Sequence, residues 1–228
     1  MTTAELISRT TTRLGDDPAL PVGYYSRSEI LVALNQVYRM MAFFTLCLET
    51  TVTFSLQANT AYYKMLSTYA DWILPLRIRL ASGAKLRPCR LADLAALDAS
   101  WSTTAGTPER YALEGFDLLA VYKRPTATTS TSIVYARTPV ALALDADVPE
   151  LQTEYHQALI DGAIPVLRSK EGAQEFSKVL PQWQRYMDAI QKLGGYVRAR
   201  NKEQGYDYMP VELARFDKSK LMEVAGGR

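Results

Sequence analysis

The spacing of apolar residues changes twice along this 228-residue chain. Over residues 30–41 the apolar side chains step by three or four positions, as they do along one face of an α-helix. Over residues 52–56 they alternate with Thr and Ser, which is the pattern of a half-buried strand. Helical spacing returns after Pro149. Helices, then strands, then helices predict an α+β fold in which the terminal helices pack together and the strands project from them.

The helix predicted from Ser26 to about Phe44 begins with the strongest local signal, a Ser-Arg-Ser-Glu capping box that ends at Glu29. A helix over 4–14 is expected to stop at Gly15. The other expected helices are 91–97, 151–166 and 176–190, with a stop at Gly194-Gly195, and the strand candidates after 52–56 are 74–80, 109–113, 116–122 and 132–137.

We therefore predict four segments. These are N-terminal helices of a bundle in 1–48, a β-rich insert in 49–147, C-terminal helices of the bundle in 148–195 and an extended C-terminal arm in 196–228.

The charge is nearly balanced, with 26 Lys and Arg against 24 Asp and Glu, so the chain is not a bulk polycation. A local basic cluster nevertheless lies in residues 72–92, which contain no acid. It can be read as a DNA-facing surface or as the solvated outer face of a strand, and both interpretations stay open. The cluster consists of Arg77, Arg79, Lys85, Arg87 and Arg90.

The C-terminal arm carries side chains that are common in protein interfaces. Tyrosine and methionine bury a large area, and tyrosine keeps a polar handle. An ordinary tail that packs on its own domain is the alternative. The candidate interface residues are Tyr196, Arg198, Arg200, Tyr206, Tyr208 and Met209.

Motifs for catalysis or cofactor binding are missing from the sequence, which has no phosphate-binding loop, dinucleotide fingerprint, nucleophile elbow or H-E-x-x-H. His156 is the single histidine, and we expect it on a helix surface or at an interface rather than in a catalytic site. Cys47 and Cys89 have neither zinc nor disulfide spacing. Asp16-Asp17 is better explained as a helix-ending turn than as a metal ligand pair. We expect no enzyme activity, no cofactor and no metal.

No apolar run is long enough to cross a bilayer, and the N-terminal residues do not form a secretory signal. The chain is therefore expected to be soluble, intracellular and without membrane contact.

The order of short motifs resembles the head-to-tail adaptor (connector) proteins of tailed bacteriophages. Leu34-Asn35-Gln36-Val37-Tyr38 is similar to the second of the family's opening helices. Gly106-Thr107-Pro108-Glu109-Arg110-Tyr111, followed by 118–125, is similar to its β segment. Val148-Pro149-Glu150-Leu151 is similar to its entry into the third helix, although Pro165 departs from the plain helix typical there.

This resemblance implies a structural virion protein at the head–tail junction, made in the host cytoplasm. Such adaptors form a ring, usually a dodecamer, that joins the portal protein to a tail or nozzle protein and lets DNA pass with transient, non-specific contact. The arm would then contact the portal or a neighbouring subunit. Two other classes stay open: a sequence-nonspecific nucleic-acid-binding module using the basic cluster, and a small enzyme with a site near His156.

Overall fold

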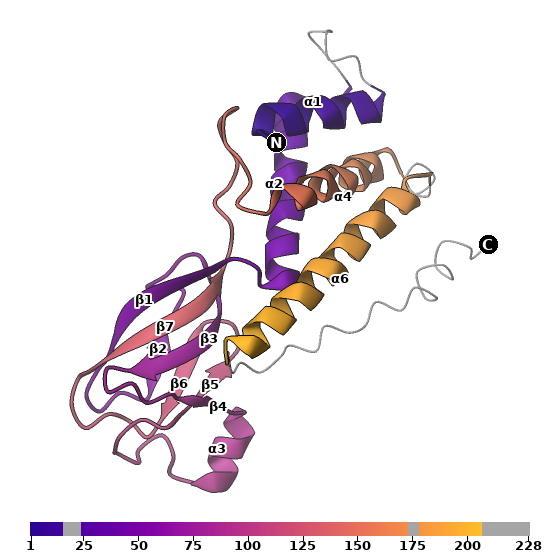
Figure 1. Ribbon diagram of the computed structural model, residues 1–228. Helices are drawn as coiled ribbons and strands as arrows, with labels where there is room; N and C mark the ends of the chain where they lie inside the picture. The colour runs from indigo at the N-terminus through magenta and orange to yellow at the C-terminus, as the bar shows by residue number, and fades with distance from the viewer. Residues whose placement is uncertain (16–23, 173–177, 207–228) are drawn as a thin grey trace. The chain divides into compact units, whose positions relative to one another are not determined.

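The computed structural model describes residues 1–15, 24–172 and 178–206 (Figure 1). These residues form two compact units. The helical unit comprises Met1–Cys47 and Pro139–Val197, and the sheet unit comprises Leu48–Thr138 with residues 198–206. Five α-helices and two sheets occur in the described residues, so the fold is mixed α+β.

The helical unit begins with α1 (Thr3–Leu14) and α2 (Arg27–Thr45). Both helices start with a complete capping box, in which a Thr or Ser hydroxyl accepts from the amide three residues on and a glutamate reaches back. The prediction of a helix from Ser26 is thus correct to within a residue at each end. Gly15 ends α1 with a φ of 84°, a conformation that glycine adopts without strain.

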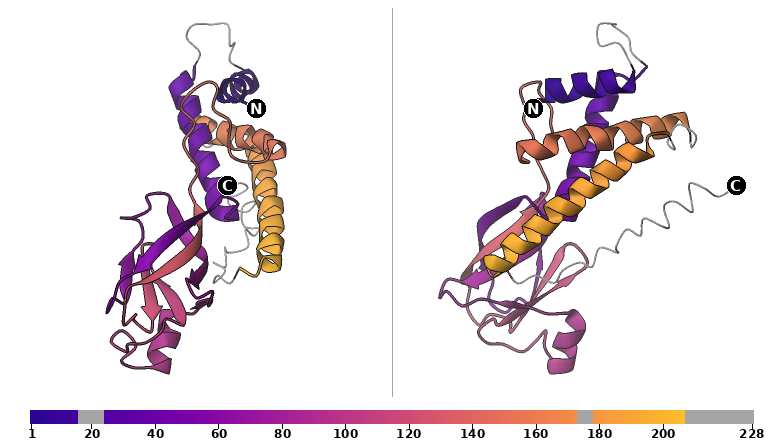
Figure 2. Two further views of the ribbon diagram at one scale, coloured as in Figure 1. Left: turned by 60° about the vertical axis from the view of Figure 1, so that its left-hand side comes forward. Right: turned by 45° about the vertical axis from the view of Figure 1, so that its right-hand side comes forward.

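The second half of the helical unit contains α4 (His156–Arg168) and α6 (Leu180–Glu203). The turn η1 (Thr153–Tyr155) precedes α4, and η2 (Ser169–Glu171) follows it. Figures 1 and 2 show α4 crossing α2, with which it makes its most extensive contact. One apolar core joins these helices, and its largest fully buried side chains include Leu6, Ile30, Leu34, Tyr38 and Tyr186.

The predicted end of the last helix at Gly194-Gly195 is wrong. Helix α6 runs through both glycines to Glu203, so residues 196–203 of the predicted extended arm are helical. Burial explains the difference, because Val197 is 2% exposed and Asn201 is fully buried, and their packing outweighs the low helix propensity of glycine. The rest of that predicted arm, from residue 207, lies outside the described residues.

The first sheet of the sheet unit has the strand order β1-β7-β3 and is antiparallel throughout. Its strands are β1 (Glu49–Leu56), β7 (Thr129–Arg137) and β3 (Trp72–Leu80). The predicted alternation is present in β1, where Thr51, Thr53 and Ser55 are exposed and their neighbours turn inward. The alternation does not run through the whole sheet, because the consecutive residues Ile133–Ala136 of β7 are all buried, so that strand is covered on both faces there.

The second sheet has the order β2-β6-β5-β4. An apolar core with side chains from both sheets joins them, including Ile78 and Ile133 from the first and Leu119 and Val121 from the second. On its other face the second sheet packs against Leu94 of α3. The elements are β2 (Tyr62–Lys64), β6 (Leu118–Tyr122), β5 (Arg110–Glu114), β4 (Arg87–Pro88) and α3 (Leu91–Leu97).

Candidate interaction surface

The end of α6 and the turn after it lie against the outer face of the β1-β7-β3 sheet. The Arg77 guanidinium of β3 sits 5.0 Å from the centroid of the Tyr206 ring. A cation over an aromatic face is worth about 0.5–2 kcal/mol, depending on how far water is excluded. Lys85 also donates to the carbonyl oxygen of Gly205. Two basic side chains of the sheet unit therefore hold the turn that follows α6.

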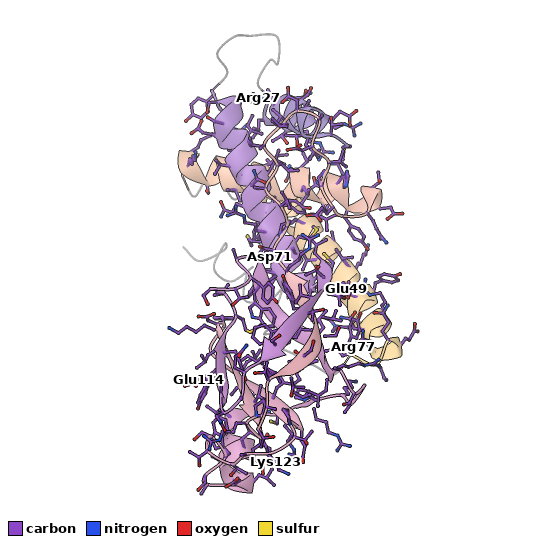
Figure 3. The ribbon with its side chains drawn as sticks, turned by 90° about the vertical axis from the view of Figure 1, so that its left-hand side faces the viewer. Arg27, Glu49, Asp71, Arg77, Glu114 and Lys123 are labelled. Atoms are coloured by element: carbon purple, nitrogen blue, oxygen red, sulfur yellow. The ribbon has the colours of Figure 1, made fainter. Side chains whose placement is uncertain are left out.

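Glu49, at the start of β1, is the acceptor at the centre of this contact. Its Oε2 accepts from the Arg200 guanidinium at 3.2 Å, and its Oε1 accepts from the Tyr206 hydroxyl at 3.4 Å. Figure 3 labels Glu49 and Arg77, whose side chains lie beside the end of α6. Burial, and then the charge of Glu49, raise the pKa of Tyr206, so its hydroxyl stays protonated and able to donate.

The structure divides the predicted DNA-facing cluster. Arg77 and Lys85 are engaged with the end of α6, whereas Arg79, Arg87 and Arg90 are exposed. Within the described parts of the chain the guanidinium groups of these three arginines form no ion pair, although the backbone amide of Arg90 donates to Asp93 at 3.2 Å. They come from three places, namely β3, β4 and the residue before α3.

The predicted interface residues are divided in a similar way. Tyr196 is 57% exposed on α6, and Arg198 is exposed two residues later. Arg200 and Tyr206 belong to the Glu49 contact. Tyr208 and Met209 lie outside the described residues.

The sequence analysis did not identify Glu49 as a functional residue. It also did not predict that the basic cluster and the candidate interface residues contact each other. The signal available was position: Glu49 is the one acid in a strand whose outward positions are otherwise Thr and Ser. Its partners lie 151 and 157 residues away in the sequence, beyond the range of any local pattern. We call the group of Glu49, Arg77, Lys85, Arg200, Gly205 and Tyr206 the α6 anchor.

His156 is buried, at 1% exposure, and not on a surface as predicted. Its Nε2 lies 3.0 Å from the carbonyl oxygen of Leu151, and its Nδ1 lies 2.8 Å from the Met1 nitrogen. Both ring nitrogens are thus used by the packing of the helical unit, which gives the histidine a structural explanation.

Cys47 and Cys89 form no disulfide and are partly exposed, and the Cys89 thiol donates to the carbonyl of Tyr111 at 3.3 Å. Among the described residues no group of three His, Cys, Asp or Glu side chains could hold a metal ion. Asp16 and Asp17 fall outside the described ranges. None of the described helices combines the length and apolar character that a bilayer crossing requires.

An anchored helix end and exposed apolar and basic side chains are features of a protein that interacts with other macromolecules, and this α+β chain has them. Comparison with protein families gives a match to the SU10 adaptor protein family over residues 1–211. The chain belongs to this family of phage head-to-tail adaptors, so the resemblance noted in the sequence is confirmed. No curated protein matches the chain.

Membership in this family indicates a structural role in the phage virion as an adaptor between head and tail. An adaptor family of this kind implies interaction with portal and tail proteins in general.

Proposed function

We propose that this protein forms a ring, a dodecamer, that joins the portal at the capsid vertex to the tail or nozzle protein and lets DNA pass. The observation that carries the proposal is the family match over residues 1–211. The nearly neutral charge of +2 agrees with it, since a channel lining must not hold DNA tightly.

In this proposal the helices of 1–48 and 148–195 form a bundle that makes the ring body, and the insert 49–147 faces the tail side or the outside. The segment from Tyr196 onward contacts the portal or a neighbouring subunit. Two findings support a contact role for this segment. Tyr196 is a large exposed aromatic side chain, and the α6 anchor fixes the point from which residue 207 continues.

Transient DNA contact is proposed for Arg79, Arg87 and Arg90, because these side chains are exposed, whereas Arg77 and Lys85 are engaged within the α6 anchor. Their triple substitution by alanine should lower any retention on DNA. It should also reduce the salt dependence of that retention, by up to about 0.9 in log–log slope for each lost phosphate contact. If DNA retention and its salt dependence are unchanged, this assignment is wrong.

The proposed function is tested by light scattering of the chain alone and after mixing with the portal protein of the same phage. We expect a complex many times the 25.5 kDa of one chain, either preformed or formed on the portal. A monomer that stays a monomer with the portal contradicts the proposal.

A shortened chain ending at Tyr206 tests the role of the last segment. Its cut falls after the α6 anchor and after buried Val197 and Asn201, so the described fold should be retained. We expect normal thermal unfolding but weakened portal binding. Equal portal binding by both chains would remove residues 207–228 from the interface.

A further inference from the structure

The outer edge of strand β1 is open. β1 is an edge strand of the order β1-β7-β3, so a neighbouring strand covers one of its two edges (Figure 1). The side chains of Thr51, Thr53 and Ser55 are exposed. Among the described residues, no hydrogen bond from outside the β1–β7 pair reaches the backbone of these three residues. Beyond the α6 anchor at Glu49, the described part of the chain therefore leaves this edge unpaired.

The strand register determines which backbone groups face the open edge. The amide of Arg137 donates to the carbonyl of Leu48 at 2.9 Å, and in an antiparallel pair such bonded positions alternate with unbonded ones. The even-numbered residues of β1 therefore bond to β7. The other side of β7 agrees, because the carbonyl of Ser130, which lies opposite an odd-numbered residue of β1, accepts from Ala81 next to β3. The backbone N–H and C=O groups that point outward are those of Thr51, Thr53 and Ser55.

The other sheet edges in the described residues are protected. β3 contains Pro75 and two register shifts, and residues 84–86 already bond to the backbone of Ile78 and Leu80 on its outer side. β2 has three residues, and β4 has two, one of which is Pro88. Proline, register shifts and short length are the usual means by which sheet edges are kept from pairing with other chains. β1 has none of these, because its eight residues keep one register and contain no proline, so its edge is a predicted site of association.

The chemistry of this edge matches an extended polypeptide. Its outward donors and acceptors recur at every second residue, about 6.6–6.8 Å apart, which is the repeat of another strand. On the inner face, the side chains of an added strand would contact Val52 and Phe54, which are only partly buried at the margin of the sheet-unit core. On the outer face they would lie beside Thr51 and Thr53. The matching partner is therefore an extended segment in which apolar and small polar residues alternate.

The proposed ring decides which protein supplies this segment. Among the described residues, the long unprotected edge that a second copy offers is β1 itself. A β1–β1 pair is isologous and has a two-fold axis, whereas a ring that joins different proteins on its two sides has none. The edge is therefore left for a different protein. In the proposed function the segment from Tyr196 onward contacts the portal or a neighbouring subunit, and the insert 49–147 that contains β1 faces the tail side or the outside.

We propose that the tail-side protein donates an extended segment that pairs with the outer edge of β1 and adds a fourth strand to the β1-β7-β3 sheet. Main-chain hydrogen bonds to Thr51, Thr53 and Ser55 supply the affinity, and alternate side chains beside Val52 and Phe54 supply the specificity. The inference rests on the proposed function and names the surface that binds the tail.

Amide hydrogen exchange tests the pairing residue by residue. In the chain alone, the amides of Thr51, Thr53 and Ser55 should exchange fast and those of Val52 and Phe54 slowly, because only the latter bond to β7. The purified tail protein of the same phage is then added to the chain alone and to its complex with the portal. It should slow exchange at the three outward amides at least tenfold, while the two inward amides serve as the internal control.

Proline substitution gives a second, independent test. Thr53→Pro removes one outward N–H and leaves the β1–β7 bonds in place, so the fold should be retained, since edge strands tolerate proline at such positions. Binding of the tail protein should weaken at least tenfold with nearly unchanged thermal unfolding. Thr53→Val is the matched control, because it keeps the N–H at the same exposed position and should bind like wild type. Val52→Pro removes an N–H that faces β7 and should lower the melting temperature, which verifies the assignment of inward and outward groups.

Unchanged exchange at the three outward amides in the presence of the tail protein, or wild-type binding by folded Thr53→Pro, would overturn the proposed pairing. Slow exchange at these amides in the chain alone, or with the portal alone, would also overturn it, because a second copy or the portal would then occupy the edge. If the chain still joins the portal in these cases, the adaptor function stands and only this pairing is wrong. Protection by the tail protein in a chain that ignores the portal would uphold the pairing and contradict the proposed ring on the portal.

Discussion

Substitution of Gly162 by alanine tests how closely α4 and α6 approach each other. A Cβ atom on Gly162 would lie 2.8 Å from Cδ2 and 3.0 Å from Cγ and Cε2 of the Tyr186 ring. The ring cannot easily move away, because Tyr186 is fully buried and its hydroxyl donates to the carbonyl of Val37 at 2.6 Å.

Two effects of this substitution oppose each other. Alanine is favoured over glycine inside a helix by about 1 kcal/mol, whereas overpacking a rigid core costs about 1–3 kcal/mol. Because three ring atoms are affected, we expect the cost of overpacking to exceed the gain in helix propensity by up to about 2 kcal/mol. The melting temperature of the helical circular dichroism signal should then fall by up to about 8 °C.

Gly195→Ala is the matched control, since Gly195 is also inside a helix but has no atom within 4 Å of its would-be Cβ. This variant should be stabilised by about 0.5–1 kcal/mol. In a Tyr186→Ala background, Gly162→Ala should also become stabilising, because the obstructing ring is gone. If Gly162→Ala raises stability in the wild-type background, the reasoning about this contact is refuted.

Three further predictions concern stability. Burial raises the pKa of Tyr63 to about 12, so its contribution to the unfolding free energy is intact below about pH 10 and is lost as the pH rises toward 12. Urea unfolding at increasing pH should show this loss, and Tyr63→Phe should reduce it. Asp161→Asn should lower the unfolding free energy by about 1–3 kcal/mol in the same assay, because this carboxylate is only 9% exposed and forms ion pairs with two arginines. Asp145→Asn is the control, because the Asp145 side chain is 69% exposed in its ion pair, and it should cost under about 1 kcal/mol. Ser26→Ala should lower the unfolding free energy by about 1 kcal/mol through loss of the α2 cap, while Ser8→Ala, at an exposed position inside α1, should not lower it.

Local signals predicted the elements of this fold well. The capping box at Ser26 located α2, the alternation around Phe54 located β1, and the short helix α3 has the predicted bounds of 91–97. Each of these signals lies within a few residues of the structure that it specifies. The family resemblance added the functional class, which no single residue indicated.

Long-range contacts explain what the sequence did not reveal. Gly194-Gly195 is an ordinary stop signal, and only the burial of Val197 and Asn201 shows why the helix continues. In the α6 anchor, Arg77 contacts Tyr206 although more than a hundred residues separate them in the sequence. A residue predicted to face DNA and a residue predicted to bind a protein therefore contact each other. The predicted surface position of His156 was wrong for the same reason, because the burial of this side chain depends on residues far away in the chain.

The sheet unit interrupts the helical unit in the sequence, and this has a consequence for synthesis on the ribosome. The strands from β1 to β7 are complete once residue 138 has emerged, whereas α2 waits for a partner such as Tyr186, which is 149 residues after Val37. At about 5–20 residues per second, the apolar face of α2 stays incompletely covered for about 7–30 s. During that interval the nascent chain carries all the strands of the sheet unit, without the end of α6 that completes it, and an unfinished helical unit. Molecular chaperones of the host are therefore expected to bind it at α2.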